Sequence, residues 1–374
     1  MSATSILINL DNLNNNLKVI RTKIGEKMKV MAIVKSNAYG HGAVEVSKCL
    51  VNQGVDYLAV TNLPEALELR LAGIKIPILI IALIDFDEYC QCLQNDIMLT
   101  ICSYQQLEQL EKFAEEAKIK AKVVLKVDTG MNRIGIKYSE AANYANYILQ
   151  CNNIELKGVT THLASADAGF NEFTQQQLEK FKQAVAQISQ VIDSIEIISI
   201  ANSAGIFVLE PLYGNTVRAG IALYGLKPDE NIPVDLSALK PVLSFKSKVL
   251  FIKEIESLEK IGYSGTFTAQ NSTQIATIPV GYAEGYPRNL SNKAVVLIKN
   301  KMYPIVGNIC MSTLMVDLGL NKAEIAVGDE VQLIGGNNLE QITVDYLAKQ
   351  AGLINYELVC GLKGNLKREY ISEL

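Results

Sequence analysis

Residues 30–60, VMAIVKSNAYGHGAVEVSKCLVNQGVDYLAV, contain one complete strand, helix and strand unit of this 374-residue chain. The apolar, β-branched run at 30–34 predicts a buried strand, and 57–60 predicts the next one. Between them, residues 43–53 have the apolar spacing of a helix. Two buried runs joined by a helix are typical of neighbouring parallel strands, so this stretch favours an α/β fold.

The same unit recurs along the chain as far as residue 217. Further β-rich runs predict strands at Tyr57–Val60, Ile78–Ala82, Ile97–Ile101, Val123–Val127, Leu156–Thr161, Ile195–Ile200 and Asn215–Val217. Helical patterns lie between most of them, at Ala43–Gln53, Pro64–Leu71, Asp85–Gln94, Ser103–Ala117, Ser139–Cys151 and Glu172–Val191. Alternation repeated eight times predicts a closed (β/α)8 TIM-type barrel, with a doubly wound open sheet as the alternative.

The sequence changes in character after Pro228. Residues 229–239 are polar and interrupted by proline, and the remainder is expected to be mostly antiparallel β-structure without long helices. The expected strands are Phe245–Ile255, Gln274–Pro279, Ala294–Ile298, Leu314–Val316 and Glu330–Ile334. We therefore predict a barrel at residues 11–238 and a β-rich C-terminal domain at 239–374, which also includes an N-terminal strand at 1–10.

The bulk composition argues for a small-molecule partner. A net charge of −4 gives no field that would attract nucleic acid or an anionic membrane surface. Neither a membrane-spanning apolar stretch nor a signal-peptide pattern is evident, so a cytoplasmic location is expected. Seven scattered cysteines suggest reduced core thiols, and with only two histidines a histidine-rich metal centre is excluded.

Polar and charged residues follow several of the predicted barrel strands. Lys35 comes directly after the run 30–34, and a buried ammonium is costly unless it is paired, neutral or condensed with a carbonyl. Arg133, His162, Ser203 and Arg218 follow the fifth to eighth strands. Because the carboxyl ends of barrel strands share one rim, these residues predict an active site there.

The last two barrel loops have the residues expected of an anion site. Asn202, Ser203 and Gly205 follow the seventh strand, and Gly220 follows the eighth, where barrels commonly bind phosphate. A phosphate site combined with an amine that traps aldehydes points to pyridoxal 5′-phosphate (PLP).

Over almost its whole length the chain resembles the alanine racemases. The matching segments are VMAIVKSNAYGHG, LKVDTGMNRIG, GVTTHLASAD, NTVRAGIALYGL, IGYSGTF, PVGYAEGYPR, VGNICMS and INYE. The resemblance implies PLP-dependent interconversion of L- and D-alanine, supplying D-alanine for peptidoglycan. A broad-range or serine racemase of the same fold and a non-catalytic PLP-carrying barrel protein are the alternatives.

The resemblance also implies roles for individual residues. Lys35 would hold PLP through a Schiff base, and the other cofactor-binding residues would be Tyr39, His162, Asn202, Ser203, Arg218, Gly220, Ile221 and Tyr356. Arg133, Met311 and Tyr282 would bind substrate. Lys126 is suggested to carry a carbamate, with an ordinary ammonium paired with Asp128 as the alternative. No metal is implied.

Racemisation needs a base on each face of a planar intermediate. The resemblance assigns these roles to Lys35, for the α-proton of D-alanine, and to Tyr263 of the partner subunit, for that of L-alanine, so the expected unit is a homodimer. We expect His162 and Arg218, joined by a hydrogen bond, to supply the positive charge that lowers the pKa of Tyr263. The segment VGNICMS departs from the family pattern, with Asn308 where arginine is usual and Ser312 where aspartate is usual.

Overall fold

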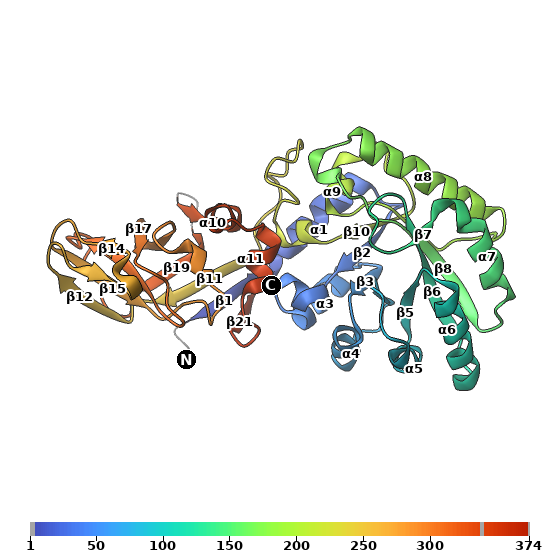
Figure 1. Cartoon of the computed structure of the whole chain (residues 1–374), viewed down its shortest axis with the longest axis horizontal. Coiled ribbons are helices and arrows are strands. Elements are labelled where there is room, and N and C mark those ends of the chain that lie inside the picture. The colour runs from blue at the N-terminus through green and yellow to red at the C-terminus, as the bar shows by residue number, and fades with distance from the viewer. Residues whose placement is uncertain (1–3, 337–339, 373–374) are drawn as a thin grey trace. The chain divides into compact units, whose positions relative to one another are not determined.

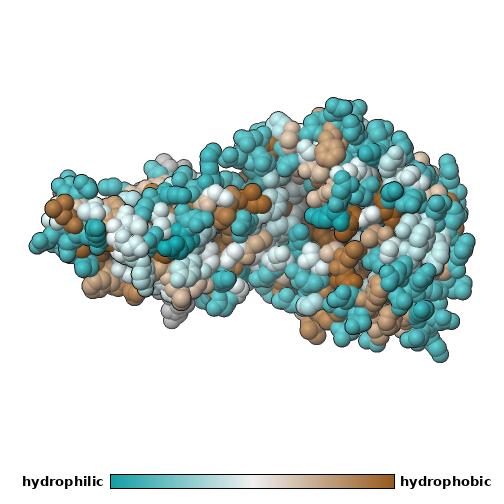
Figure 2. All heavy atoms as spheres, viewed as in Figure 1, coloured by the Kyte–Doolittle hydropathy of each residue, from teal (hydrophilic) through white to brown (hydrophobic). Residues whose placement is uncertain are grey.

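The computed structural model describes residues 4–336 and 340–372, which fall into two compact units (Figure 1). The barrel unit comprises Asn14–Ala38 and Ala43–Leu239. The β unit comprises Met1–Leu13, Tyr39–Gly42 and Lys240–Leu374. Within the described ranges, no helix combines the length and apolar character needed to span a membrane. Figure 2 shows a mainly hydrophilic surface with small hydrophobic patches.

Parallel strands form the wall of the barrel unit. In the described residues their order is β10-β2-β3-β4-β5-β6-β8-β9. Their bounds are Lys29–Ile33 (β2), Tyr57–Val60 (β3), Ile78–Ile80 (β4), Ile97–Ile101 (β5), Ala121–Asp128 (β6), Ile154–Thr160 (β8), Ile197–Ser199 (β9) and Thr216–Ala219 (β10). Backbone hydrogen bonds from Asn215 to Ile198 (3.0 Å) and from Arg218 to Ala201 (2.9 Å) join the last two strands. The ring is nearly closed, and the predicted (β/α)8 barrel is confirmed.

Helices cover the strands as the apolar spacing predicts. They are α3 (Ala43–Asn52), α4 (Leu63–Leu71), α5 (Tyr89–Gln94), α6 (Tyr104–Ala117), α7 (Ala141–Gln150) and α8 (Glu172–Ser189). The hydroxyl of Ser103 accepts from the Gln106 N–H at 3.2 Å and so caps α6. The helix predicted from Asp85 begins instead as a short 3-10 turn, Phe86–Glu88, which leads into α5.

The longest of the helices that were not predicted from the sequence is α1 (Leu10–Ile24). Its asparagines favour turns and caps over helix interiors, which weakens the local signal. The side chains that it buries are nevertheless spaced as on one helix face: Leu13, Leu17, Ile20 and Ile24. Tertiary burial therefore outweighs local preference in this segment.

The β unit contains one large sheet. In the described residues the strand order is β12-β15-β18-β17-β16-β19-β11-β1-β21, and β20 pairs with β19. The bounds are Ser5–Asn9 (β1), Leu243–Lys248 (β11), Phe251–Ile255 (β12), Thr273–Ile278 (β15), Val295–Ile298 (β16), Lys301–Val306 (β17), Leu314–Gly319 (β18), Glu330–Gly336 (β19), Gln341–Ile342 (β20) and Lys367–Ile371 (β21). Two short helices, α10 (Val344–Ala351) and α11 (Asn355–Gly361), follow β20.

The single strand predicted at Phe245–Ile255 is wrong. The chain forms two strands there, because β11 pairs with β1 and β19 whereas β12 pairs with β15. Between them, the N–H of Val249 donates to the backbone carbonyl of Asp329, and the N–H of Leu250 donates to that of Thr277, both at 2.9 Å. At these two residues the chain passes from one set of neighbouring strands to another. Tertiary structure decides this change, and the continuous apolar pattern of the sequence gives no sign of it.

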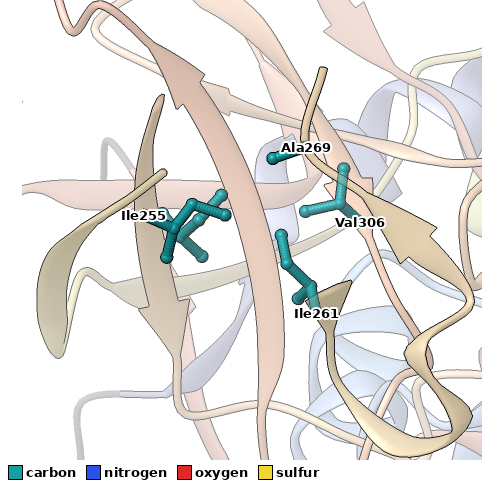
Figure 3. Close-up of a cluster of buried hydrophobic side chains, with 5 residues drawn as sticks. Ile255, Ile261, Ala269 and Val306 are labelled. Carbon is teal, nitrogen blue, oxygen red and sulfur yellow. The ribbon is translucent and has the colours of Figure 1, made fainter. Parts of the chain in front are cut away.

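A small hairpin extends from this sheet and carries Tyr263. Its strands are β13 (Lys260–Ile261) and β14 (Phe267–Thr268). Ile261 is buried in a hydrophobic cluster, and Figure 3 shows its side chain converging with those of Ala269 and Val306. Burial of apolar side chains at the base of the hairpin thus fixes the position of a loop that is itself exposed.

Candidate active site

Lys35 lies at the carboxyl end of β2, where the backbone takes an unusual course. The N–H of Val34 still donates to Ala59 at 2.9 Å, so the chain follows the neighbouring strand as far as Lys35. The next residues, Ser36, Asn37 and Ala38, have φ of 54°, 53° and 53°. Left-handed backbone costs roughly 1–2 kcal/mol for each such residue, and strain of this kind is found mostly at functional sites.

Hydrogen bonds from surrounding groups hold this left-handed turn in place. The N–H of Ser36 donates to Glu65 Oε1 at 2.6 Å, and Asn37 Oδ1 accepts from the N–H of Ala43 at 2.8 Å. The N–H of Ala38 donates to the Val34 carbonyl at 2.9 Å. The turn therefore fixes the backbone from which the Lys35 side chain extends.

Arg218 lies inside β10 rather than after it, which corrects the position predicted from the sequence. Its side chain is buried, and Nη1 donates to the carbonyl and the hydroxyl of Ser199, at 2.8 and 2.9 Å. Nη2 donates to the carbonyls of Thr161 (2.8 Å) and Ile200 (3.2 Å). Burial lowers the pKa of Arg218 to about 10, which still leaves the guanidinium charged at neutral pH.

The Nε–H of Arg218 has no partner among residues 4–336 and 340–372. Because both Nη groups are anchored to the barrel wall, Nε–H is the donor left for a ligand. A buried cation held by neutral carbonyls, with one N–H unused, is the arrangement expected for an acceptor atom supplied by a cofactor.

His162 accepts a hydrogen bond from Arg218. The Nδ1 to Nη2 distance is 3.3 Å, and since a guanidinium only donates, Nδ1 must be the unprotonated nitrogen. Burial lowers the pKa of His162 well below its usual value, and Arg218, Lys126, Arg133 and Lys35 lower it further. The expected hydrogen bond is present, but the expectation of a positively charged His162 is wrong, because burial, together with the surrounding cations, favours the neutral imidazole.

Lys126 is also buried among cations. It belongs to β6, is 8% exposed, and lines a small pocket with Asp128, Arg133, Thr161 and His162. Burial lowers the pKa of its amine well below the usual value, and Arg218 and Arg133 add to this more than Asp128 opposes it. In the described part of the chain, no ion pair joins Lys126 to Asp128, whose Oδ1 accepts instead from the backbone N–H of Gly130 at 2.9 Å.

Several neutral side chains support this pocket and were not identified from the sequence. Gln177 Nε2 donates to the His162 carbonyl at 2.9 Å and to the Thr129 hydroxyl at 3.2 Å. The hydroxyls of Thr129 and Thr161 lie 2.8 Å apart. Ser199, which binds Arg218, could have been suspected because it is a polar residue within an apolar strand.

Ser203 and Gly220 meet at the end of the barrel formed by the last two loops. The Ser203 hydroxyl accepts from the N–H of Gly220 at 2.9 Å and from that of Ala222 at 3.4 Å. The described residues contain no acceptor for the hydroxyl proton. Asn202 caps the following helix, α9 (Ser203–Val208), by accepting from Gly205 at 2.9 Å. This donor set fits an anion, because the hydroxyl oxygen is already satisfied and its proton is not.

Two further predicted cofactor residues lie in the β unit. The rings of Tyr39 and Tyr356 are 6.0 Å apart and tilted by 58°. Burial raises the pKa of Tyr39 above its usual value, so the phenol stays protonated and able to donate.

Three further predicted residues of the β unit have large, exposed side chains. The exposed fractions are 71% for Tyr263, 42% for Tyr282 and 60% for Met311. Tyr282 and Met311 lie in adjacent segments, since the N–H groups of Tyr282 and Ala283 donate to the carbonyls of Cys310 (3.2 Å) and Met311 (2.7 Å). Asn308, in the same segment, donates to the Tyr263 carbonyl at 2.8 Å. The three exposed side chains therefore belong to connected loops.

Comparisons with known proteins agree along the whole chain. Residues 8–228 match the model of the alanine racemase N-terminal domain, and 242–370 match that of the C-terminal domain. The alanine racemase of Halothermothrix orenii is 37% identical over 367 residues, which is 98% of this chain and 96% of that protein.

Solved structures give the same result. Alanine racemase from Clostridium difficile 630 has a TM-score of 0.94 at 36% identity and covers 100% of this chain and 97% of its own. Alanine racemase from Bartonella henselae, described with covalently bound pyridoxal phosphate, has a TM-score of 0.87 at 28% identity, with 98% and 99% covered. The chain therefore belongs to the alanine racemase family of isomerases.

Proposed function

We propose that this protein interconverts L-alanine and D-alanine with PLP in a homodimer, by a two-base mechanism, and so supplies D-alanine for peptidoglycan. The observation that carries the proposal is the cluster of Arg218, His162 and Lys126 at the end of the barrel where Lys35 emerges from β2. Such a site suits an anionic cofactor and a carboxylate substrate. A cytoplasmic location stays a prediction.

The residues of the barrel unit fit PLP. Lys35 would hold it covalently, and Ser203, Gly220 and Ile221 would bind its phosphate, helped by Tyr39 and Tyr356. Asn202 would contribute to the cofactor site by capping α9. The Bartonella henselae alanine racemase, with its covalently bound pyridoxal phosphate, supports this assignment. When bound, the cofactor supplies electron withdrawal from the substrate α-carbon.

Arg218 would moderate that electron withdrawal. Its free Nε–H would donate to the pyridine nitrogen, and a guanidinium does not release its proton at neutral pH. The nitrogen then stays unprotonated, which limits the lifetime of negative charge on the substrate and disfavours side reactions. His162, whose pKa is lowered by burial and by Arg218, would pack beside the ring without adding a second cation.

Lys35 and Tyr263 would be the two bases. Lys35 would remove and return the α-proton of D-alanine, and Tyr263 of the partner subunit would do so for L-alanine. The exposure of Tyr263, Tyr282 and Met311 supports this arrangement, because large apolar side chains on connected loops are typical of a surface covered by another chain. Arg133, which is exposed at the end of the barrel unit, would bind the substrate carboxylate with the Met311 N–H, and Tyr282 would line the approach.

Lys126 would carry a carbamate. The lowered pKa favours the neutral, nucleophilic form of its amine, and that amine plus CO2 gives a carbamate and one released proton. The product is an anion in a pocket lined by Arg133 and close to Arg218, and it would orient Arg133 toward the substrate. The absence of an ion pair to Asp128 in the described ranges favours the carbamate over the ordinary ammonium.

The first experiment separates the enzyme from its alternatives. Purified protein is given L-alanine, L-serine and larger L-amino acids, and D-product is measured by chiral chromatography. We expect racemisation of alanine well above that of the others. Comparable rates on serine or on larger substrates would favour the broad-range or serine racemase, and bound cofactor without any racemisation would favour the carrier.

Variants test the bases and the dimer. Lys35→Ala should lose covalently bound cofactor, and borohydride reduction followed by peptide mapping should label only Lys35 in the parent protein. Tyr263→Phe should keep the cofactor and lose racemisation. Coexpressed, the two inactive chains should recover about a quarter of the parent activity, because half of randomly mixed dimers contain one intact shared site. No recovery would contradict a shared site.

A further inference from the structure

The backbone conformation of the loop that carries Tyr263 depends on residues outside the loop. Residues Gly262, Ser264 and Gly265 have φ of 72°, 63° and 51°, and one backbone hydrogen bond, from Gly265 to Gly262 at 3.1 Å, closes the turn. Tyr263 itself is 71% exposed. A loop with left-handed backbone and an exposed side chain needs support from outside its own residues.

Two asparagines supply that support, one at each end of the loop. Asn308 Nδ2 donates to the Tyr263 carbonyl at 2.8 Å. Asn292 Nδ2 donates to the Thr266 hydroxyl at 3.1 Å. Neither amide touches the Tyr263 side chain in these bonds, so any effect on the phenol is transmitted through the backbone.

The segment that carries Asn308 is itself fixed. Asn292 Oδ1 accepts from the Gly307 N–H at 2.6 Å, and the Ser291 hydroxyl accepts from the Ile309 N–H at 2.9 Å. Gly307 has φ of 74°, and a Cβ there would lie 2.9 Å from the Ile261 carbonyl. The backbone on both sides of Asn308 is therefore pinned to its neighbours, and the amide has a defined direction.

We propose that Asn308 is a positioning residue, which sets where the phenol of Tyr263 is presented to the site of the partner subunit. The inference rests on the proposed role of Tyr263 as a base. A short, neutral amide performs the positioning through one hydrogen bond to a backbone carbonyl. Small displacements of a catalytic group have large effects on rate, and we expect Asn308→Ala to lower kcat/KM about tenfold.

A test in D2O reveals which base is affected. Starting from D-alanine, Lys35 removes the α-proton at its normal rate, but a displaced Tyr263 delivers its proton slowly, so deuterium returns to D-alanine more often than L-alanine forms. When the reaction starts from L-alanine, D-alanine forms more often than deuterium returns to L-alanine, because Lys35 completes the reaction at its normal rate once Tyr263 has removed the α-proton. The quantity to compare is the ratio of deuterium incorporated into the remaining substrate to product formed. Relative to the parent protein, Asn308→Ala should show a higher ratio when the reaction starts from D-alanine and a lower ratio when it starts from L-alanine.

A second readout does not depend on catalysis. Amide hydrogen exchange of residues 262–266, measured by mass spectrometry on the cofactor-bound protein, should be faster in Asn308→Ala. Asn308→Gln, which retains an amide donor, should show smaller changes than Asn308→Ala in both the deuterium ratios and the amide exchange. Asn321→Ala is the matched control, because Asn321 Nδ2 makes the same kind of bond, to the Ile325 carbonyl at 3.0 Å, in another loop of the β unit. It should change neither the ratios nor exchange at 262–266.

The outcomes separate the inference from the function on which it rests. A purely structural defect reduces the amount of active enzyme and leaves both deuterium ratios at parent values; that result, or unchanged exchange at 262–266, would overturn the role of Asn308. If Tyr263→Phe keeps racemase activity, the assignment of Tyr263 as a base fails instead, whatever the Asn308 variants show.

Discussion

Replacing His162 by asparagine should make the protein less sensitive to acid. In the folded chain Nδ1 of His162 accepts from Arg218 at 3.3 Å, so a proton there would break that bond and place a second cation beside the guanidinium. The asparagine carbonyl keeps an acceptor near the position of Nδ1 but cannot be protonated. The two proteins therefore differ mainly in one titration.

The sign and the size follow from linkage. The imidazole of an unfolded chain has a pKa of about 6.5, and the folded pKa of His162 lies well below its usual value. Above about pH 6.5 the imidazole is neutral in both the folded and the unfolded chain, so His162 makes no contribution to the pH dependence of stability. Below about pH 6.5 only the unfolded chain takes up the proton, so between pH 7.5 and pH 5.5 the parent protein loses about 1.4 kcal/mol of stability that His162→Asn does not lose.

Urea denaturation of both proteins at the two pH values measures this difference. We expect the free energy of unfolding of His162→Asn, relative to the parent, to rise by about 1.4 kcal/mol on going to the lower pH. Because the chain has only two histidines, NMR of histidine-labelled protein gives an independent check. An equal difference at both pH values, or a His162 resonance that titrates near the unperturbed pKa, would refute the argument that burial and the surrounding cations hold the ring neutral.

Three other outcomes test the site and its support. With 13C-labelled CO2, a carbamate resonance should appear in the parent protein and be missing from Lys126→Gln; its absence from the parent would favour the plain amine. Ser203→Ala leaves the buried Gly220 N–H without its acceptor, so it should weaken PLP binding, followed by cofactor fluorescence, and lower stability by about 1–3 kcal/mol. Ile261→Ala should cost about 2–5 kcal/mol of stability in thermal melts and lower kcat through Tyr263, while PLP binding stays at the parent level.

Local pattern was sufficient for the barrel and for part of its site. Strands β3 (Tyr57–Val60) and β5 (Ile97–Ile101) have the predicted bounds, because a short, wholly buried strand is a continuous apolar run in the sequence. Lys35 could be singled out since it ends such a run. The contact between Asn308 and the Tyr263 carbonyl could not be derived from spacing, because the two residues lie 45 positions apart in the chain.

The sequence by itself determined the alternation of strands and helices, the rim on which the reactive residues lie and the family resemblance, since these depend on residue type and short-range order. Only the tertiary structure decided the charge states. Arg218 lies within β10 and is held by carbonyls from two other segments, and burial beside cations distant in the chain lowers the pKa values of His162 and Lys126. A pKa depends on what surrounds a group in space, and that environment exists only once the barrel has closed.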